Sequence, residues 1–302
     1  KYGYDLMEDR WPDFLEGRLG ISPSRLPRVQ APGELAGRVT AERAASTGLP
    51  EGTPVAAGMT DGCASQISSG AAAPGQYNTT IGTTLVIKGV SERLLLDPLG
   101  RIYCHRHPAG WWLPGGASNT GAECLSVEFG PEATAELSPR ALEVSPTGLV
   151  SYPLVGRGER FPFRNPDAEG FLLGEPRSRL HAFAARLEGV ACLERLAYET
   201  LEELGARIGE TVFTAGGGSA SDAWLQIRAD TLNRTIRRPA QTGAAMGAAI
   251  LAASLQRYGD LSQATRAMVN VDSEVAPRGG YVDAYEETYR GFRTELSRRG
   301  YV

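Results

Sequence analysis

The stretch GMTDGCASQISSGAAAPGQYNTTIGTT, residues 58–84, decides the fold and carries the main candidate chemistry. Thr60 has the character of a helix N-cap, and Asp61 follows in the first turn of a helix predicted over residues 61–72. Small residues make up most of this helix, so a ligand or another backbone can approach it closely. Asp61 is therefore a candidate general base for a substrate hydroxyl, although a first-turn acid that only stabilises its own helix has the same position.

A hairpin is predicted directly after this helix. Residues 76–81 and 85–90 are rich in β-branched side chains and predict two strands, which Gly82, Thr83 and Thr84 join. Such a turn can point backbone N–H groups and hydroxyls at phosphate oxygens, as a nest does. A plain hairpin turn is the alternative, because glycine followed by threonine is a common pair.

A glycine run in the second half of the chain is a further candidate. Residues 211–215 predict a short buried strand, which leads into Gly216, Gly217 and Gly218 and then into a helix. Three glycines let the backbone approach an anionic or flat ligand, and the start of a helix attracts negative charge. The run is not a dinucleotide fingerprint, because Ser221 replaces the third glycine, and a flexible turn is the alternative.

The other elements complete the pattern of a mixed-sheet α/β domain. Further strands are predicted at 33–40, 53–57, 101–106, 111–113 and 149–153, the second of them buried. Further helices are predicted at 11–19, 40–47, 120–129, 179–205 and 243–255, with a last amphipathic helix that carries Tyr285 and Leu296. Residues 155–170 are rich in glycine, arginine and proline and predict a loop.

Composition limits the classes of function. The 302 residues carry a net charge of −4 and include two lysines, Lys1 and Lys88, so neither a nucleic-acid surface nor a P-loop is expected. No apolar run approaches the ~20 residues of a membrane span. The four cysteines are scattered, which favours a reduced, cytoplasmic setting. His105 and His107 alternate on a predicted strand, and without a third ligand at a standard spacing they favour polar surface positions over a metal site.

Six segments, in this order, resemble those of the FGGY family of carbohydrate kinases. They are GLPEGTPVAAGMTDGCA from Gly48, NTTIGTT from Asn78, GGASNTGAECL from Gly115, GERFPFRNPDAEG from Gly158, AGGGSASDAWLQIRADTLNRTIRRP from Ala215 and TGAAMGAAILAA from Thr242. The wording MTDGCASQ and NTTIGTTLVIKG is most similar to the branch of ribulose and xylulose kinases.

The resemblance implies an actin-like ATPase fold of the ribonuclease H-like type, with a mixed sheet flanked by helices, and it implies ATP and Mg²⁺. It implies that Asp61 is the catalytic base and that Asp61 and Gly62 contact the acceptor. It also implies a nucleotide site formed by Gly82, Thr83, Thr84, Gly121, Gly216, Gly217 and Ser221.

The resemblance further implies that the chain holds two parts of unequal completeness. Residues 1–74 are expected to be the remnant of a preceding sugar-binding lobe, including the helix of Asp61. Residues 75–302 are expected to be the C-terminal nucleotide-binding domain. Family members begin with a lobe that carries an Asp-x-Gly-Thr strand turn and most sugar contacts. That lobe is expected to be largely missing here, which predicts an inactive fragment.

The expected reaction is transfer of the γ-phosphoryl group of ATP to a hydroxyl of a pentulose similar to D-ribulose or D-xylulose. The alternatives are a kinase for another polyol or sugar, such as glycerol or L-ribulose, a nucleotide-binding module without transfer activity, and an ATPase switch like the relatives of actin. The expected partner is a small sugar or polyol, with neither nucleic acid nor a membrane. A homodimer is compatible with the sequence.

Overall fold

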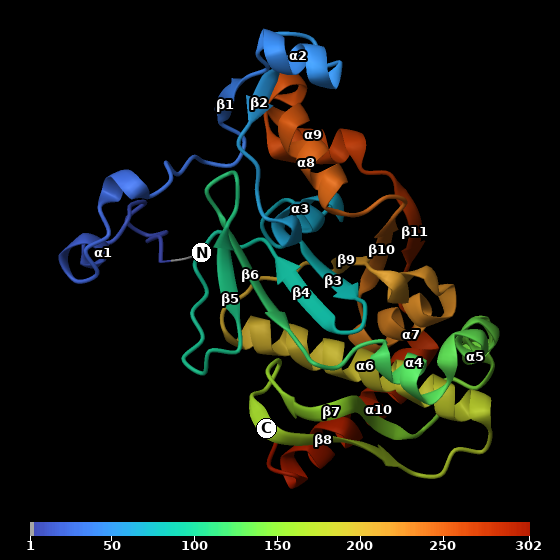
Figure 1. The fold of residues 1–302 in the computed structure, drawn as a ribbon. Coiled ribbons are helices and arrows are strands. Elements are labelled where there is room, and N and C mark those ends of the chain that lie inside the picture. Colours follow the sequence, from blue (N-terminus) through green and yellow to red (C-terminus); the bar gives the residue numbers. More distant parts are fainter. Residues whose placement is uncertain (1–2) are drawn as a thin grey trace. The chain divides into compact units, whose positions relative to one another are not determined.

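The computed structural model describes residues 3–302, and its contacts divide the chain into two compact units, Lys1–Met59 and Thr60–Val302. The first unit contains α1 (Phe14–Gly17), the 3₁₀ turn η1 (Pro23–Arg25), β1 (Leu35–Arg38), α2 (Ala41–Thr47) and β2 (Pro54–Ala56). β1 and β2 pair in antiparallel register (Figure 1). The lobe boundary predicted after residue 74 stays a prediction, because the compactness of this chain does not define the lobes of longer proteins.

The first unit confirms one local prediction and corrects another. The helix predicted at 40–47 is present as α2: the Thr40 hydroxyl accepts the N–H of Arg43, and Gly48 ends the helix with a left-handed φ of +74°. The strand predicted at 53–57 is present as β2, but the prediction that it is buried is wrong, since Val55 is 46% exposed. A two-stranded ribbon of this length has too few neighbours to cover both its faces.

A seven-stranded mixed sheet forms the middle layer of the second unit, in the order β11-β10-β9-β3-β4-β6-β5. Its strands are β3 (Tyr77–Ile81), β4 (Leu85–Gly89), β5 (Tyr103–Arg106), β6 (Trp112–Ala117), β9 (Thr211–Ala215), β10 (Thr235–Pro239) and β11 (Val271–Val275). β3 and β10 run parallel to β9, whereas β4, β6, β5 and β11 join in antiparallel pairs. The sheet confirms the predicted α/β class and places β3 between β4 and β9.

Helices cover both faces of this sheet (Figure 1). They are α3 (Asp61–Ser68), α4 (Glu123–Glu128), α5 (Gly130–Leu137), α6 (Arg179–Glu203), α7 (Asp222–Leu232), α8 (Ala244–Ala253), α9 (Leu261–Met268) and α10 (Gly279–Arg298), with shorter turns η2 (Ser138–Glu143), η3 (Gly217–Ala220) and η4 (Ser254–Tyr258). α6 lies on one face, where the Tyr198 and Thr79 hydroxyls hydrogen-bond at 2.7 Å. α3 lies on the other face, where a methyl group added to Gly70 would meet the ring of Phe213 at 2.8 Å.

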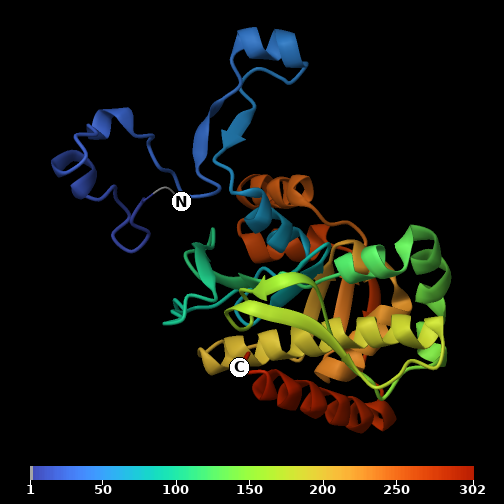
Figure 2. The same cartoon turned by 60° about the horizontal axis from the view of Figure 1, so that its bottom comes forward.

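A second hairpin packs outside this sandwich. β7 (Val150–Glu159) and β8 (Asn165–Leu173) pair in antiparallel register, so the loop predicted at 155–170 is wrong. Figure 2 shows the hairpin and α10 beside α6. Their shared core comprises Tyr152, Leu154, Phe163, Ala168, Phe171, Cys192, Leu193, Leu196, Tyr289, Phe292 and Leu296. Burial of these aromatic faces stabilises a segment whose glycines and prolines favour no regular structure on their own.

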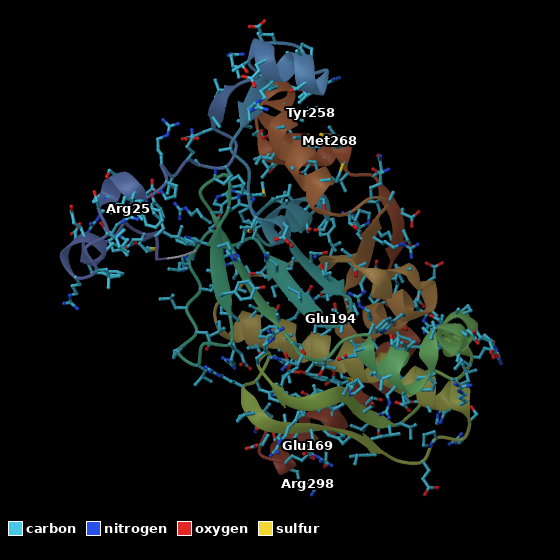
Figure 3. The ribbon with its side chains drawn as sticks, viewed as in Figure 1. Arg25, Glu169, Glu194, Tyr258, Met268 and Arg298 are labelled. Carbon is cyan, nitrogen blue, oxygen red and sulfur yellow. The ribbon has the colours of Figure 1, made fainter. Side chains whose placement is uncertain are left out.

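A buried ion pair joins the helices to the middle of the sheet. Glu194 of α6, labelled in Figure 3, accepts two hydrogen bonds of 2.7 and 2.8 Å from Arg228 of α7, and neither side chain has any exposed area. Arg228 also donates to the Thr214 hydroxyl of β9 at 2.8 Å, and that hydroxyl donates to the Thr79 carbonyl of β3 at 3.1 Å. This network connects the two strands that end beside Gly216 and the predicted phosphate turn.

Two helix predictions need adjustment. The helix predicted at 61–72 ends at Ser68, because Gly70 takes a φ of +98° that a helix does not continue through. The helix predicted at 120–129 is shorter, Glu123–Glu128. Among the described residues, no helix is long and apolar enough to cross a membrane.

Candidate nucleotide and phosphoryl-transfer site

Three glycine-bearing segments meet at the ends of β3 and β9. A methyl group on Gly121, which lies just before α4, would approach the Thr83 carbonyl oxygen to 2.5 Å. A methyl group on Gly216 would overlap the Ile81 carbonyl oxygen, and Gly216 has a φ of +86°. Both positions therefore require glycine. The structure brings the predicted segments around residues 82–84, 121 and 216 into direct contact.

The turn between β3 and β4 contains two backbone donors that take no part in the sheet ladder. The Gly82 amide donates to the Thr84 carbonyl at 3.0 Å, and the Gly82 carbonyl accepts the Ala122 amide at 2.8 Å. Within residues 3–302, the Thr83 and Thr84 amides donate to no protein acceptor. Thr83 is exposed. Adjacent unused N–H groups in a turn form a concave site for an anion such as phosphate.

A cavity of about 1120 Å³ opens next to these segments. α4, α5 and η2 line one side of it, and η3, α7 and β11 line the other. The predicted residues Gly217 and Ser221 lie on its wall, and a methyl group on Gly217 would have no heavy atom within 4 Å. The Ser221 hydroxyl accepts the Trp224 amide at 3.2 Å as the N-cap of α7 and accepts the Ser138 hydroxyl at 2.7 Å. The volume suits a nucleoside-sized ligand.

Glu159 of β7 fixes the segment that leads to Gly121. It is 3% exposed, and its two carboxylate oxygens accept five hydrogen bonds. The donors are the hydroxyls of Ser118 (2.7 Å), Thr120 (3.1 Å) and Tyr152 (3.0 Å) and the backbone amides of Asn119 (2.6 Å) and Arg160 (2.9 Å). The Leu85 amide in turn donates to the Thr120 carbonyl at 2.9 Å. Glu159 therefore holds the Gly121 segment against the start of β4.

Asp61 lies at the exposed start of α3, as predicted. Its carboxylate accepts the Gly62 amide at 2.7 Å, while the Thr60 side chain, predicted as the N-cap, makes no capping hydrogen bond. A methyl group on Gly62 would lie 3.2 Å from the ammonium nitrogen of Lys88 on β4. The carboxylate is thus accessible to a substrate and is flanked by a cation from the sheet.

Close packing against α8 sets the position of α3. A methyl group on Gly247 of α8 would overlap the Ala64 carbonyl oxygen of α3. The Gly243 amide, at the start of α8, donates to the Ser68 hydroxyl at 2.9 Å. Helices in such close contact shift together, so α8 determines where Asp61 is presented.

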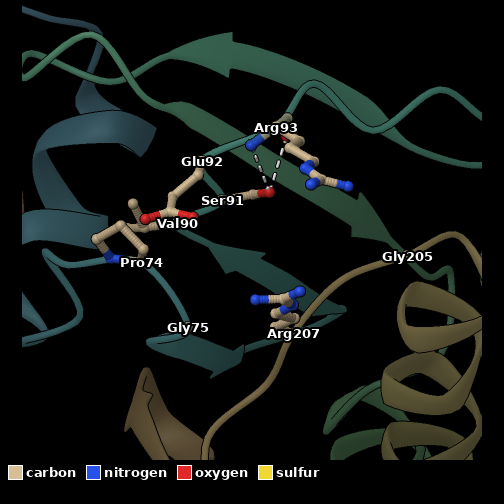
Figure 4. Close-up of a pocket in the computed structure, with 8 residues that line it drawn as sticks. All are labelled: Pro74, Gly75, Val90, Ser91, Glu92, Arg93, Gly205 and Arg207. Atoms are coloured by element: carbon tan, nitrogen blue, oxygen red, sulfur yellow. Dashed lines mark hydrogen bonds between the residues drawn. The ribbon is translucent and has the colours of Figure 1, made fainter.

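A smaller cavity of the second unit is lined by none of the predicted site residues. A cavity of about 260 Å³ lies at the opposite end of the β3–β4 hairpin from the turn (Figure 4). It is lined by Pro74, Gly75, Val90, Ser91, Glu92, Arg93, Gly205 and Arg207. The Ser91 hydroxyl closes the loop there by donating to the Arg93 carbonyl at 2.8 Å.

One of the two histidines, His107, differs from the prediction of polar surface positions. His107 is 1% exposed, so its surface placement is wrong, and burial lowers the pKa of its imidazole to about 4. Its Nδ1 accepts the Ala109 amide at 3.1 Å, which gives the buried ring a structural contact. In residues 3–302, no group of three or more His, Cys, Asp or Glu side chains is arranged to hold a metal ion.

Some residues of the site escaped sequence reasoning. Glu159 was predicted only as part of a loop, and nothing in its local sequence shows that it would accept five donors. Gly218 was named in the glycine run but given no role. A methyl group on Gly218 would meet Ile81 and Trp224 at 2.8 Å, so this position needs glycine. The presence of a third glycine in the run was the sequence feature that could have indicated this.

The mixed sheet flanked by helices is the actin-like ATPase type of α/β fold, and its glycine segments converge at the ends of β3 and β9. The model of the "FGGY family of carbohydrate kinases, C-terminal domain" matches residues 80–255, more than half of the chain. The chain belongs to this family of carbohydrate kinases. Asp61 and Gly62 lie outside the matched residues.

Individual relatives agree with this assignment. The chain is 31% identical to a xylulose kinase of Bacillus subtilis over 256 residues, 80% of this chain and 50% of the relative. It is 27% identical to a gluconokinase of Bacillus licheniformis over 260 residues, with the same two coverages. The solved structure of a xylulose kinase from Rhodospirillum rubrum matches with a TM-score of 0.83 and 30% identity, covering 97% of this chain and 61% of that one. The chain spans about half the length of these curated relatives.

Proposed function

We propose that the chain is the nucleotide-binding and base-carrying portion of an ATP-dependent kinase that phosphorylates a pentulose similar to D-xylulose or D-ribulose. The observation that supports it is the turn 82–84, whose Thr83 and Thr84 amides donate to no acceptor within the described residues. That turn lies where segments containing Gly121 and Gly216 converge. The adjoining cavity of about 1120 Å³ accommodates the nucleoside, and the turn holds the phosphates.

The reaction follows from these positions. Asp61 accepts the proton of the acceptor hydroxyl, whose oxygen attacks the γ-phosphorus. The bond from that phosphorus to the β,γ-bridging oxygen breaks, and ADP leaves. The amides of Thr83 and Thr84 hold the phosphates, and a Mg²⁺ ion bound with ATP would supply further positive charge against them. In this class of reaction, positioning and electrostatic stabilisation supply most of the rate enhancement.

Two kinds of relative set the range of acceptors to test. The curated relatives include xylulose kinases and gluconokinases. D-Xylulose, D-ribulose, L-ribulose, glycerol and D-gluconate therefore form the panel, with ADP release from the full-length gene product as the readout. A pentulose is expected to give the highest kcat/KM, and ATP turnover that ignores every acceptor would refute the proposal in favour of an ATPase switch.

The role of Asp61 is tested by replacing it with asparagine in the full-length gene product. Loss of a general base is expected to lower kcat by about 10²–10⁴ while ATP binding stays unchanged. Asp167→Asn is the matched control, because that carboxylate forms only an exposed ion pair with Arg157 on the β7–β8 hairpin. Near-normal turnover by the Asp61→Asn variant would remove Asp61 from the mechanism.

The activity of this chain by itself is a separate question. We expect it to bind ATP with Mg²⁺ in titration calorimetry and to show no sugar-dependent ADP release, because it spans about half of its curated relatives. Sugar-dependent release from this chain alone would show that residues 1–302 contain a complete acceptor site.

A further inference from the structure

Arg238 of β10 connects three elements that border the proposed nucleotide cavity. Its Nη1 donates to the Ser219 carbonyl of η3 at 2.9 Å and, at 3.5 Å, to the Ala220 carbonyl. The same nitrogen donates to the Asp222 carboxylate in the first turn of α7 at 2.8 Å. Its Nε and Nη2 both contact Oδ2 of Asp272 on β11, at 2.8 and 2.7 Å. One side chain therefore links η3, α7 and β11.

These three elements form one side of the cavity of about 1120 Å³. Ala220 of η3, Asp222 of α7 and Ser273 of β11 all line it. The Arg238 side chain is 18% exposed, and it lies outside the set of described residues that line the cavity. Its printed donors are directed to protein acceptors. Arg238 therefore acts on the wall of the cavity and not on a ligand inside it.

The glycine run gives this wall a particular need for support. Glycines leave the backbone more conformations than other residues do, so the position of η3 depends on contacts made around it. A methyl group on Gly217 would meet no heavy atom within 4 Å, which leaves that part of the run without close packing. Gly218 fixes the turn on the side of Ile81 and Trp224. Arg238 fixes it on the side of β11, through the Ser219 carbonyl and Asp272.

The neighbouring residue Arg237 separates this role from simple strand pairing. Arg237 stands opposite Glu274 of β11 in the ladder and forms an ion pair with it at 2.7 Å, with the two side chains 40% and 50% exposed. Both arginines thus join β10 to β11, but Arg238 also reaches η3 and α7. The planar guanidinium, with its five N–H donors, suits a residue that binds several acceptors at once.

We propose that Arg238 is a positioning residue for the nucleotide, which holds η3 and the start of α7 against β11 and so keeps one side of the nucleoside cavity in a single shape. This inference rests on the proposed function, which places ATP in that cavity. Arg238 supports the nucleoside and not the reacting atoms, so its contribution is the same in the ground state and in the transition state. Such a contribution changes the KM for ATP and leaves kcat unchanged.

The test is Arg238→Met in the full-length gene product, by steady-state kinetics with the best acceptor of the panel and by ATP titration calorimetry with Mg²⁺. Methionine keeps an apolar stem and removes the donors. The KM and Kd for ATP are expected to rise about tenfold, the effect of losing one charge-assisted hydrogen bond. The kcat at saturating ATP and the KM for the sugar should stay within about twofold.

Two further variants separate positioning from stability. Arg238→Lys keeps a charge beside Asp272 but lacks the planar fork, so the KM for ATP should rise only about threefold, and this variant decides the question if Arg238→Met does not fold. Arg237→Met is the matched control, because it removes a β10–β11 ion pair that does not reach the cavity wall, and its KM for ATP should equal that of the wild type.

Three results would count against these assignments. An ATP KM and Kd unchanged in both Arg238 variants, or raised equally by Arg237→Met, would overturn the positioning role. A wild-type protein that binds ATP and phosphorylates no acceptor would refute the proposed function, and the ATP titrations of the Arg238 variants would still decide this inference. A wild-type protein that binds no ATP would refute both.

Discussion

The carboxylate of Glu159 offers the sharpest test of how the site is held, through a comparison of Glu159→Gln with Glu159→Ala. In the wild type, one oxygen accepts the amides of Asn119 and Arg160, and the other accepts three hydroxyls. A glutamine can keep its carbonyl oxygen towards the two amides. Its NH₂ group then donates to the hydroxyls, which can rotate and accept, so the expected loss is about 1 kcal/mol.

Alanine has no such rearrangement. The hydroxyls can turn to other acceptors, but the part-buried amides of Asn119 and Arg160 lose an acceptor that is itself 3% exposed. Each amide left without an acceptor costs about 1–3 kcal/mol, so Glu159→Ala is expected to lose about 4 kcal/mol. For a unit of this size, 1 kcal/mol corresponds to about 2–4 °C in Tm, which separates the two variants by roughly 10 °C.

Thermal and urea unfolding measure this difference, and ATP titration reports its effect on the site. ATP binding should weaken in the same order, because Glu159 holds the segment that places Gly121 on Thr83. Glu169→Gln on β8, an exposed carboxylate labelled in Figure 3, is the matched control and should behave like the wild type. Equal losses for Gln and Ala, or losses below about 1 kcal/mol for both, would refute the assignment of five accepted hydrogen bonds.

Three substitutions test other buried contacts. Gly247→Val is expected to cost about 1–3 kcal/mol by forcing α8 away from Ala64, and thermal unfolding without a Tm decrease would contradict this. Glu194→Gln leaves Arg228 buried without its counter-charge, so urea unfolding should show that the free energy of unfolding falls by about 3–5 kcal/mol. A fall below about 1 kcal/mol would contradict this expectation. Burial raises the pKa of Glu188 from 4.5 to about 7, so the folded state binds more protons than the unfolded one between these values. Stability should therefore fall as pH rises through that window. The urea midpoint of the wild type should show this decline, and the urea midpoint of Glu188→Gln should not.

Local signals in the sequence predicted most of the elements that form the site. The strand at 211–215 ends where the glycine run begins, and the structure has β9 over the same residues, Thr211–Ala215. The hairpin around the turn 82–84 was predicted within one residue at each strand end. These features depend on β-branched runs, glycines and caps, which act over a few residues.

Contacts between distant segments could not be predicted from spacing. Residues 155–170 contain glycines and prolines that favour a loop, yet aromatic side chains of β7, β8 and α10 stabilise a hairpin there. Glu159 reaches Asn119 across 40 residues, and the overlap of Gly247 with Ala64 involves a sequence separation that no local pattern encodes. The convergence of Gly121 with Thr83 came from the family resemblance and not from any residue period.

The contact of α8 with α3 also bears on the dynamics of the second unit. Both helices, and the turn 82–84, belong to the compact unit Thr60–Val302. The close approach of Gly247 to Ala64 and the hydrogen bond from Gly243 to Ser68 therefore couple the helix of Asp61 to α8 within this unit. Amide protons of α3 and α8 should accordingly exchange with solvent as one cooperative group.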